Sequence, residues 1–239
     1  MGLVNIRKGE GILHLILNRP EKKNALFPDF LKEIEVAMRS AGEFSVMIMS
    51  GQGGFFSAGG DLSVMLSEGG ERGMEFSKVG NEFMDFLQNY EAITIAAIEG
   101  GAYGGGLELA LSCDMRVASP HAKIGLTEIN LGLLPGWGGL KRISKVAGQG
   151  AARYVALTGK VMDGEEAYRL GLVTYLSDDP VKFSENLAID LSKKPRESIR
   201  RIKLLLGQDE YSSEMEEKMF GEILNTPSAR SRLEKFLKK

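Results

Sequence analysis

Two glutamates in glycine-rich surroundings are the residues of this chain best suited to acid/base chemistry. Glu108 stands in the segment AYGGGLELALSC, where apolar residues surround it on every side of a short expected helix: Leu107, Leu109, Ala110 and Leu111. Such a helix should be buried, so its carboxylate should point into the protein or into a cleft. Taken alone, Glu108 is equally open to a structural role, complementing a helix dipole or pairing with an arginine.

Glu128 is the second candidate, in the segment KIGLTEINLGLLPGWGGLKRI. It precedes an apolar stretch and a Pro/Gly turn. In isolation the residue is open to a simpler interpretation, as a helix cap or a surface acid. The sequence around the two carboxylates must therefore be considered before a chemical role can be assigned to them.

Glycine is unusually frequent around both carboxylates and in the chain as a whole: 30 of 239 residues are glycine, well above the usual level of about 7%. The glycines cluster at 51–60, 100–106 and 132–139, each beside an apolar run. In the second cluster they allow close approach of the backbone to a ligand, and amides at a helix N-terminus are unpaired donors that suit an oxyanion. A tight strand-to-helix turn would explain one or two of these glycines equally well.

The first cluster, GQGGFFSAGGDL, follows the apolar run VMIMSG and brings small residues to the end of an expected strand. Ligands of open α/β folds collect at the carboxyl ends of strands. A plain glycine-rich surface loop is the alternative for this cluster taken alone.

Several other classes of site are not supported by the sequence. Lys+Arg 30 against Asp+Glu 32 gives a net charge of −2, which offers no basic field for nucleic acid. There is no GxGxxG, GxxxxGK[ST] or GxSxG motif, so a dinucleotide site, a P-loop and a serine hydrolase are disfavoured. With Cys113, His14 and His121 as the whole Cys and His content, we expect neither a disulfide nor a metal site.

The elements that must position the glutamates alternate between strand and helix, so the expected fold class is α/β. Strand-like runs occur at 11–17, 46–50, 93–98 and 115–118. Helical spacing occurs between them at 30–39, 74–86 and 107–111. After residue 139 a strand signal remains at 172–176 only, and helical periodicity dominates at 151–157, 181–191, 199–206 and 215–223. We expect an α/β core at 1–180 and a C-terminal helical region at 181–239 for oligomerisation or as a lid.

The chain is expected to be a soluble, cytoplasmic protein without a membrane span. Its start, MGLVNIRKGEG, lacks the apolar region of a signal peptide. The longest apolar run, 92–113, is interrupted by Glu99, Glu108 and glycines, which makes it a poor candidate for crossing a bilayer.

Together, FFSAGGDL, AYGGGLELALSCDMRVAS and IGLTEINLGLLPGWGGLKRI resemble the enoyl-CoA hydratase/isomerase, or crotonase, superfamily. NRPEKKNAL and MFGEILNTPSARSRLEKFL also look like that family, so the resemblance covers nearly the whole chain. It implies a crotonase-like spiral of β-β-α units with C-terminal helices, assembled as a homotrimer or homohexamer. It also implies an acyl-CoA substrate and no separate cofactor, since coenzyme A is part of the substrate.

The resemblance assigns roles to the glycines and to both acids. The amides of Gly60 and Gly105 match the family's oxyanion hole for the thioester oxygen, and preorganised donors of this kind are worth roughly 3 to 4 kcal/mol each. Glu108 and Glu128 match the two catalytic glutamates of the hydratases. Adding water across a double bond needs a base for the water and an acid for Cα, so we expect Glu108 to activate water and Glu128 to protonate Cα. The reverse or a concerted assignment stays open.

Further positions are implied to contact the substrate. Ala58 and Asp61 flank the first oxyanion position, and the backbone near Ala58 would meet the adenine of coenzyme A. Lys22 could meet its phosphates, or be a solvated loop cation. Trp137 departs from the small residue usual in PGxGG, so it could limit acyl chain length, or simply be core.

Three other functions remain open at this point. A Δ3,Δ2-enoyl-CoA isomerase or an acyl-CoA decarboxylase of the same superfamily would need one carboxylate, or the oxyanion hole alone. A non-catalytic acyl-CoA-binding subunit could keep the glycines without the acids. Retention of both Glu108 and Glu128 favours the hydratase, a hydro-lyase of fatty acid metabolism.

Overall fold

The computed structural model describes residues 2–208 and 210–238, and of residues 67–72 the backbone alone. The chain forms two compact units, Met1–Ser192 and Lys193–Lys239. The predicted division between residues 180 and 181 falls after the first residue of helix α6, Pro180–Ser192. This helix packs against β3, β4 and β6 and lies within the first unit. The proposed oligomerisation or lid role of the C-terminal region stays a prediction.

A six-stranded sheet in the order β1-β2-β3-β4-β6-β8 is the centre of the first unit. The β1–β2 pair is antiparallel and every other pair is parallel. A second, two-stranded sheet pairs β5 with β7. The strands are β1 Val4–Gly9, β2 Ile12–Leu17, β3 Val46–Gly51, β4 Ile93–Ile98, β5 Gly101–Tyr103, β6 Met115–Ala118, β7 Lys123–Gly125 and β8 Tyr175–Leu176.

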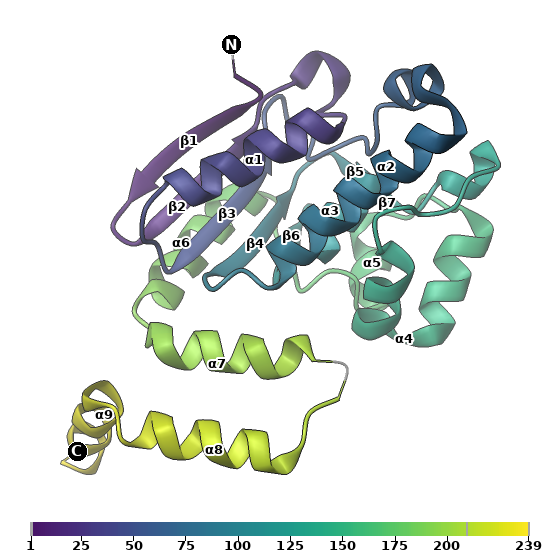
Figure 1. Cartoon of the computed structure of the whole chain (residues 1–239). Helices are drawn as coiled ribbons and strands as arrows, with labels where there is room; N and C mark the ends of the chain where they lie inside the picture. Colours follow the sequence, from purple (N-terminus) through teal and green to yellow (C-terminus); the bar gives the residue numbers. More distant parts are fainter. Residues whose placement is uncertain (1, 209, 239) are drawn as a thin grey trace. The chain divides into compact units, whose positions relative to one another are not determined.

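Helices cover this sheet on both faces (Figure 1). Those of the first unit are α1 Pro28–Ser40, α2 Leu62–Gln88, α3 Gly105–Leu111, α4 Gly139–Thr158, α5 Gly164–Arg169 and α6, with 3-10 turns η1 Pro20–Lys22 and η2 Glu128–Leu131. All residues of β3 and β4 are buried, as expected for parallel strands covered on both sides. Successive side chains of a strand point to opposite faces of the sheet: Met47 and Met49 join the cluster that includes α1, whereas Val46 and Ile48 are buried outside that cluster.

Two successive β-β-α units lead to the glutamates. In the first, β4 in the large sheet is followed by β5 in the small sheet and then by α3. In the second, β6 and β7 repeat this exchange between sheets before η2 and α4. The chain thus places the start of α3 and the start of η2 beside neighbouring strands of the small sheet, β5 and β7.

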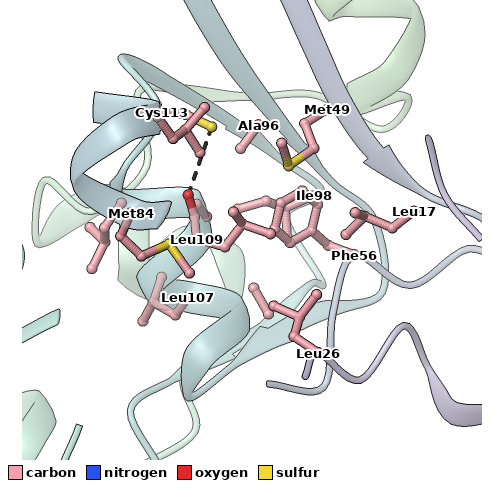
Figure 2. Packing of buried hydrophobic residues seen from close by; sticks show 14 of the residues in the cluster. Leu17, Leu26, Met49, Phe56, Met84, Ala96, Ile98, Leu107, Leu109 and Cys113 are labelled. Carbon is pink, nitrogen blue, oxygen red and sulfur yellow. Dashed lines mark hydrogen bonds between the residues drawn. The ribbon is translucent and has the colours of Figure 1, made fainter. Parts of the chain in front are cut away.

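Helix α3 is held by the main hydrophobic core. All of its residues are buried, including Glu108, which confirms the expectation of a buried helix. Figure 2 shows Leu107 and Leu109 among Phe56, Ile98 and Met84. The Cys113 thiol donates to the carbonyl of Leu109 at 3.7 Å, so this cysteine packs as a core residue at the end of the helix.

The strands predicted at 11–17, 46–50, 93–98 and 115–118 are confirmed as β2, β3, β4 and β6. The late strand signal at 172–176 corresponds to the two-residue β8. Three short or exposed strands, β1, β5 and β7, were not predicted, and α2 is much longer than the 74–86 segment.

The second unit consists of three helices, α7 Arg196–Gly207, α8 Ser213–Leu224 and α9 Pro227–Leu237. None of their described residues is buried. Arg201 of α7 forms an ion pair with Glu222 of α8 at 2.7 Å, which links these two helices. In the described residues, no helix combines the length and the apolar character needed to cross a membrane.

Candidate active site

A cavity of about 660 Å³ lies in the first unit, at the junction of α2, α3 and η2. Its volume is in the usual range for small-molecule sites, about 300 to 1,000 Å³. All of the predicted site residues line it: Lys22, Ala58, Gly60, Asp61, Gly105, Glu108, Glu128 and Trp137. Segments far apart in the sequence therefore meet around one space.

Glu108 presents its carboxylate to this cavity from α3 and is 2% exposed. Its Oε1 accepts hydrogen bonds from the backbone amides of Trp137 and Gly139, both at 2.8 Å. Burial raises the pKa of Glu108 to about 7, against the effect of these two amides, which lower it. The charge of Glu128 raises the pKa further and that of Arg142 lowers it. A carboxyl group with this pKa can exchange a proton at neutral pH.

The glycine at position 139 is required by this contact. A Cβ built there would lie 2.7 Å from Cγ of Glu108, so any side chain would push the carboxylate away. Gly139 is also the first residue of α4, where backbone amides have no acceptor within the helix and attract negative charge. Helix α4 thus directs its N-terminus at Glu108.

Glu128 begins η2 and faces the cavity in different surroundings. Its Oε2 atom is buried and, among the described residues, has no hydrogen-bond partner. Burial raises its pKa, because an unpartnered buried carboxyl favours the neutral form. A Cβ built on Gly104 would lie 3.2 Å from Oε1 of Glu128, so the glycine turn before α3 makes room for this side chain.

The backbones of Gly60 and Gly105 lie side by side, since a Cβ built on Gly105 would be 3.2 Å from the nitrogen of Gly60. The β-bridge to Leu26 uses the carbonyl of Gly59 and the amide of Asp61, which leaves the intervening amide of Gly60 directed away from the bridge. Gly105 starts α3, so its amide has no acceptor within the helix. Two neighbouring amides at a cavity wall suit an oxyanion.

Trp137 is a core residue and a wall of the cavity at once. It is 2% exposed, its indole stacks on Phe76 with ring centroids 5.1 Å apart, and its Nε1 donates to the carbonyl of Phe76 at 3.2 Å. A Cβ built on Gly80 would lie 2.0 Å from indole Cδ1, and one on Gly105 would lie 2.5 Å from Cζ3. The indole therefore fits only because both neighbouring positions are glycine.

The remaining predicted positions also line the cavity. Asp61 accepts hydrogen bonds from Ser63 and pairs with Arg19 at 2.7 Å; the Ser63 hydroxyl and Arg19 lower its pKa to about 2. Its carboxylate thereby caps α2. Lys22 is exposed at the end of η1, and Ala58 is half-buried. Their contacts with coenzyme A stay predictions.

The sequence did not predict the apolar side of the cavity, which is formed by α2, by the end of η2 and by the loop before α4. The apolar residues there are Met65, Phe76, Leu131, Leu133 and Leu134. The exposed fractions of Leu131 and Leu134 are 57% and 72%, and such unusual exposure is visible only in the folded chain. The LGLLPG segment carried a weak signal, as an apolar run beside a turn.

The model of the family described as enoyl-CoA hydratase/isomerase matches residues 7–239. The chain belongs to the enoyl-CoA hydratase/isomerase family. The predicted superfamily and the predicted crotonase-like α/β fold are thereby confirmed, and so is the expectation of an enzyme of the enoyl-CoA hydratase type, a hydro-lyase.

Individual members of the enoyl-CoA hydratase/isomerase family show how far the likeness extends. The chain is 33% identical to a probable enoyl-CoA hydratase of Bacillus subtilis, with 100% of this chain and 97% of that protein covered. A short-chain-enoyl-CoA hydratase of Clostridium acetobutylicum is 37% identical over 71% of this chain and 67% of its own length. The crystal structure of enoyl-CoA hydratase from Thermoplasma volcanium superimposes with a TM-score of 0.91 and 31% identity, covering 98% of this chain and 96% of that one.

The described residues of this chain include no candidate metal-binding cluster. No group of three or more His, Cys, Asp or Glu side chains there could hold a metal ion. The carboxyl groups of Glu108 and Glu128 share the cavity with the backbones of Gly60 and Gly105.

Proposed function

We propose that the protein is an enoyl-CoA hydratase, which adds water reversibly across the 2,3 double bond of an enoyl-CoA thioester. The observation that carries this proposal is the pair of carboxyl groups, Glu108 and Glu128, in one cavity beside the neighbouring amides of Gly60 and Gly105. The names of the relatives support the same activity.

In the proposed mechanism the thioester oxygen accepts hydrogen bonds from the amides of Gly60 and Gly105. Glu108, as the carboxylate, takes a proton from water while the water oxygen bonds to Cβ. The electrons of the double bond move onto the thioester oxygen as an enolate, which the two amides stabilise. Glu128, as the neutral acid, then gives its proton to Cα, and the C–O double bond re-forms. Hydration requires one carboxyl group in each protonation state. Burial raises the pKa of both acids and the charge of Glu128 raises that of Glu108 further, which favours one proton shared by the pair.

The apolar lining of the cavity is suited to a substrate that carries a hydrophobic acyl group. Phe76, Trp137 and Leu134 are among the residues that line it. In this proposal coenzyme A belongs to the substrate, and no separate cofactor takes part. Lys22, an exposed residue of the cavity lining, would contact the coenzyme A phosphates, and the backbone at Ala58 its adenine.

The test is to incubate purified protein with crotonyl-CoA and follow the absorbance of the conjugated thioester together with the mass of the product. Hydration removes the absorbance and adds one water to give a 3-hydroxyacyl-CoA. An isomerase would conserve the mass of a 3-enoyl-CoA while moving its double bond, and a decarboxylase would release carbon dioxide from a carboxyacyl-CoA. Tight binding of crotonyl-CoA without any conversion would instead indicate an acyl-CoA-binding subunit, and the hydratase proposal would be abandoned.

We also propose a homotrimer or homohexamer in the cytoplasm, working in fatty acid metabolism. The supporting feature is the second unit, whose helices expose large apolar side chains: Ile202, Leu206, Phe220, Phe236 and Leu237. Apolar side chains in such number are usually covered by a partner. Light scattering coupled to size-exclusion chromatography measures the mass, and a monomer at micromolar concentration would contradict this assembly.

A further inference from the structure

Glu108 is held in place by a loop and not by its own helix. Both amides that donate to its Oε1 belong to the segment before and at the start of α4. Residues 136–138 have no regular secondary structure, and Gly138 has a φ of 82°. A segment of this kind keeps its position only when other elements anchor it.

The anchor is a pair of polar side chains on α2. The Ser77 hydroxyl donates to the carbonyl of Gly136 at 2.7 Å, and Nδ2 of Asn81 donates to the same oxygen at 2.6 Å. Residues four apart share one helix face, so both donors reach one acceptor. Asn81 also donates to the Ser77 carbonyl at 2.9 Å, which fixes its orientation on the helix.

The anchored carbonyl and the amide that binds Glu108 belong to one peptide group. The peptide between Gly136 and Trp137 accepts from Ser77 and Asn81 at its oxygen and donates to Glu108 at its nitrogen. A peptide group is planar and rigid, so fixing the oxygen also fixes the direction of the N–H. Donors at the oxygen polarise the group and strengthen the hydrogen bond that its N–H makes.

We propose that Ser77 and Asn81 are positioning residues for Glu108, acting through the Gly136–Trp137 peptide to hold the carboxylate ready to accept a proton from water. This inference rests on the proposed hydratase function. Neither side chain needs to touch the reacting atoms. Their role is to keep one N–H directed at Oε1 of Glu108 while substrate enters and product leaves.

The charged groups around Glu108 are the same with or without this pair. Glu128 faces it from η2 and raises its pKa; Arg142 faces it from α4, lowers the pKa, and is itself paired with Asp85 of α2. Arg142 also donates to the Trp137 carbonyl at 2.7 Å, which anchors the next peptide. Loss of the Ser77 and Asn81 side chains would weaken the hydrogen bond that the Trp137 amide donates to the Glu108 carboxylate. Burial would then raise the pKa of Glu108 above its value of about 7.

The experiment compares Ser77→Ala, Asn81→Ala and the double variant with wild type in pH profiles of kcat and KM for crotonyl-CoA. We expect the acid limb of kcat in the double variant to move up by about one pH unit, since losing a hydrogen bond to an ionised group has effects of that order. At a pH below the limb this is about a tenfold loss of rate, whereas KM should change little. Each single variant should show a smaller displacement in the same direction.

Two matched controls separate positioning from general damage to α2. Ser77→Thr keeps the hydroxyl and should restore the wild-type profile. Lys78→Ala removes an exposed side chain from the same helix, whose partner Glu82 is 3.9 Å away, and should leave the profile unchanged. If the double variant fails to fold, the pH profiles of the two single variants are compared with that of wild type instead.

Carboxyl ¹³C NMR titration of glutamate-labelled protein gives a readout that does not need activity, with the Glu108 signal assigned from its absence in Glu108→Gln. The proposal predicts a higher midpoint for that signal in Ser77→Ala, Asn81→Ala and the double variant than in wild type. An unchanged midpoint, or a fall in kcat by the same factor at every pH, would overturn it. If wild type does not hydrate crotonyl-CoA, the hydratase proposal fails, while the NMR comparison still decides whether the pair positions Glu108.

Discussion

Glu108 and Glu128 line the same cavity, yet the protein surrounds their carboxyl groups in opposite ways. Glu108 lies in the core on a buried helix, and two backbone amides donate to one of its oxygens. Glu128 lies at the edge of a 3-10 turn, and its Oε2 is buried with no partner among the described residues. Burial raises the pKa of both groups, and backbone amides oppose that rise at each: those of Gly139 and Trp137 at Glu108, and its own amide at Glu128.

The two neighbouring acids therefore have unequal surroundings. Amide donors favour the carboxylate, and an unpartnered oxygen in a dry site favours the neutral acid. In the proposed mechanism Glu108 is the base and Glu128 is the acid.

Replacing each acid by glutamine is the strongest way to break the comparison. Glu108→Gln and Glu128→Gln should each lower kcat for crotonyl-CoA hydration by roughly 10² to 10⁴, the usual contribution of a general acid or base. The double variant should lose less than the product of the two factors, because the groups act as a unit. Initial rates of absorbance loss measure this, and a double variant within a few-fold of wild type would remove both residues from the mechanism.

The pH dependence of stability tests the burial of Glu108. Its pKa is higher in the folded chain, about 7, than the ordinary value of 4.5, so the folded state binds the proton more tightly. The resulting stability is fully present below pH 4.5 and is lost as the pH rises through 7, by about 3 kcal/mol. Glu128 should contribute a loss in the same direction.

Urea unfolding on both sides of this pH range measures the effect. Wild type should lose stability as the pH rises, whereas Glu108→Gln should give a flatter curve because an amide cannot ionise. Equal slopes for the two proteins would mean that Glu108 does not titrate in this range in the folded state.

Replacing the Trp137 indole tests whether this side chain limits the length of the acyl chain. Trp137→Ala keeps the backbone amide that binds Glu108 but removes the side chain that fills the space between Phe76 and Gly105. The ratio of kcat/KM for a longer enoyl-CoA to that for crotonyl-CoA should rise by about tenfold, the scale of a methylene or two in an apolar pocket.

The matched control for that variant is Trp137→Phe, which retains a ring and should give an intermediate ratio. The alanine variant will be less stable, so rates must be compared where circular dichroism shows both proteins folded. An unchanged ratio would mean that the indole is core only.

The smallest expected effect is that of replacing Lys22, an exposed residue of the cavity lining. Lys22→Ala should raise KM for enoyl-CoA by about two- to five-fold at low salt with little change in kcat, because an exposed ionic contact is worth at most about 1 kcal/mol. The difference should shrink as salt is added. Lys32→Ala, an exposed lysine on α1, is the control, and equal KM values for both variants would argue against a phosphate contact at Lys22.

The sequence predicted the parts of the molecule that leave a local pattern. The buried parallel strands appear as continuous apolar runs, so β3 and β4 were found almost to the residue. Strand β1 was missed because most of its side chains, including Arg7 and Lys8, face solvent at the sheet edge. Strands β5 and β7 have three residues each, too few for any periodicity.

The same limit applies to the site. Glu108, Glu128 and the glycines were found because their residue types are unusual in apolar surroundings and match family motifs. Ser77 and Asn81 look like ordinary polar positions on an amphipathic helix, and their shared acceptor at Gly136 is more than fifty residues away in the chain. Only the folded structure brings them together.

The contact between Gly80 and Trp137 restricts how this enzyme can evolve. A single methyl group at position 80 would occupy the volume of the indole, so position 80 cannot hold a side chain while position 137 holds tryptophan. A lineage can acquire alanine at position 80 only after residue 137 has become smaller. The glycine on helix α2 therefore fixes the order in which mutations at this wall of the cavity can occur.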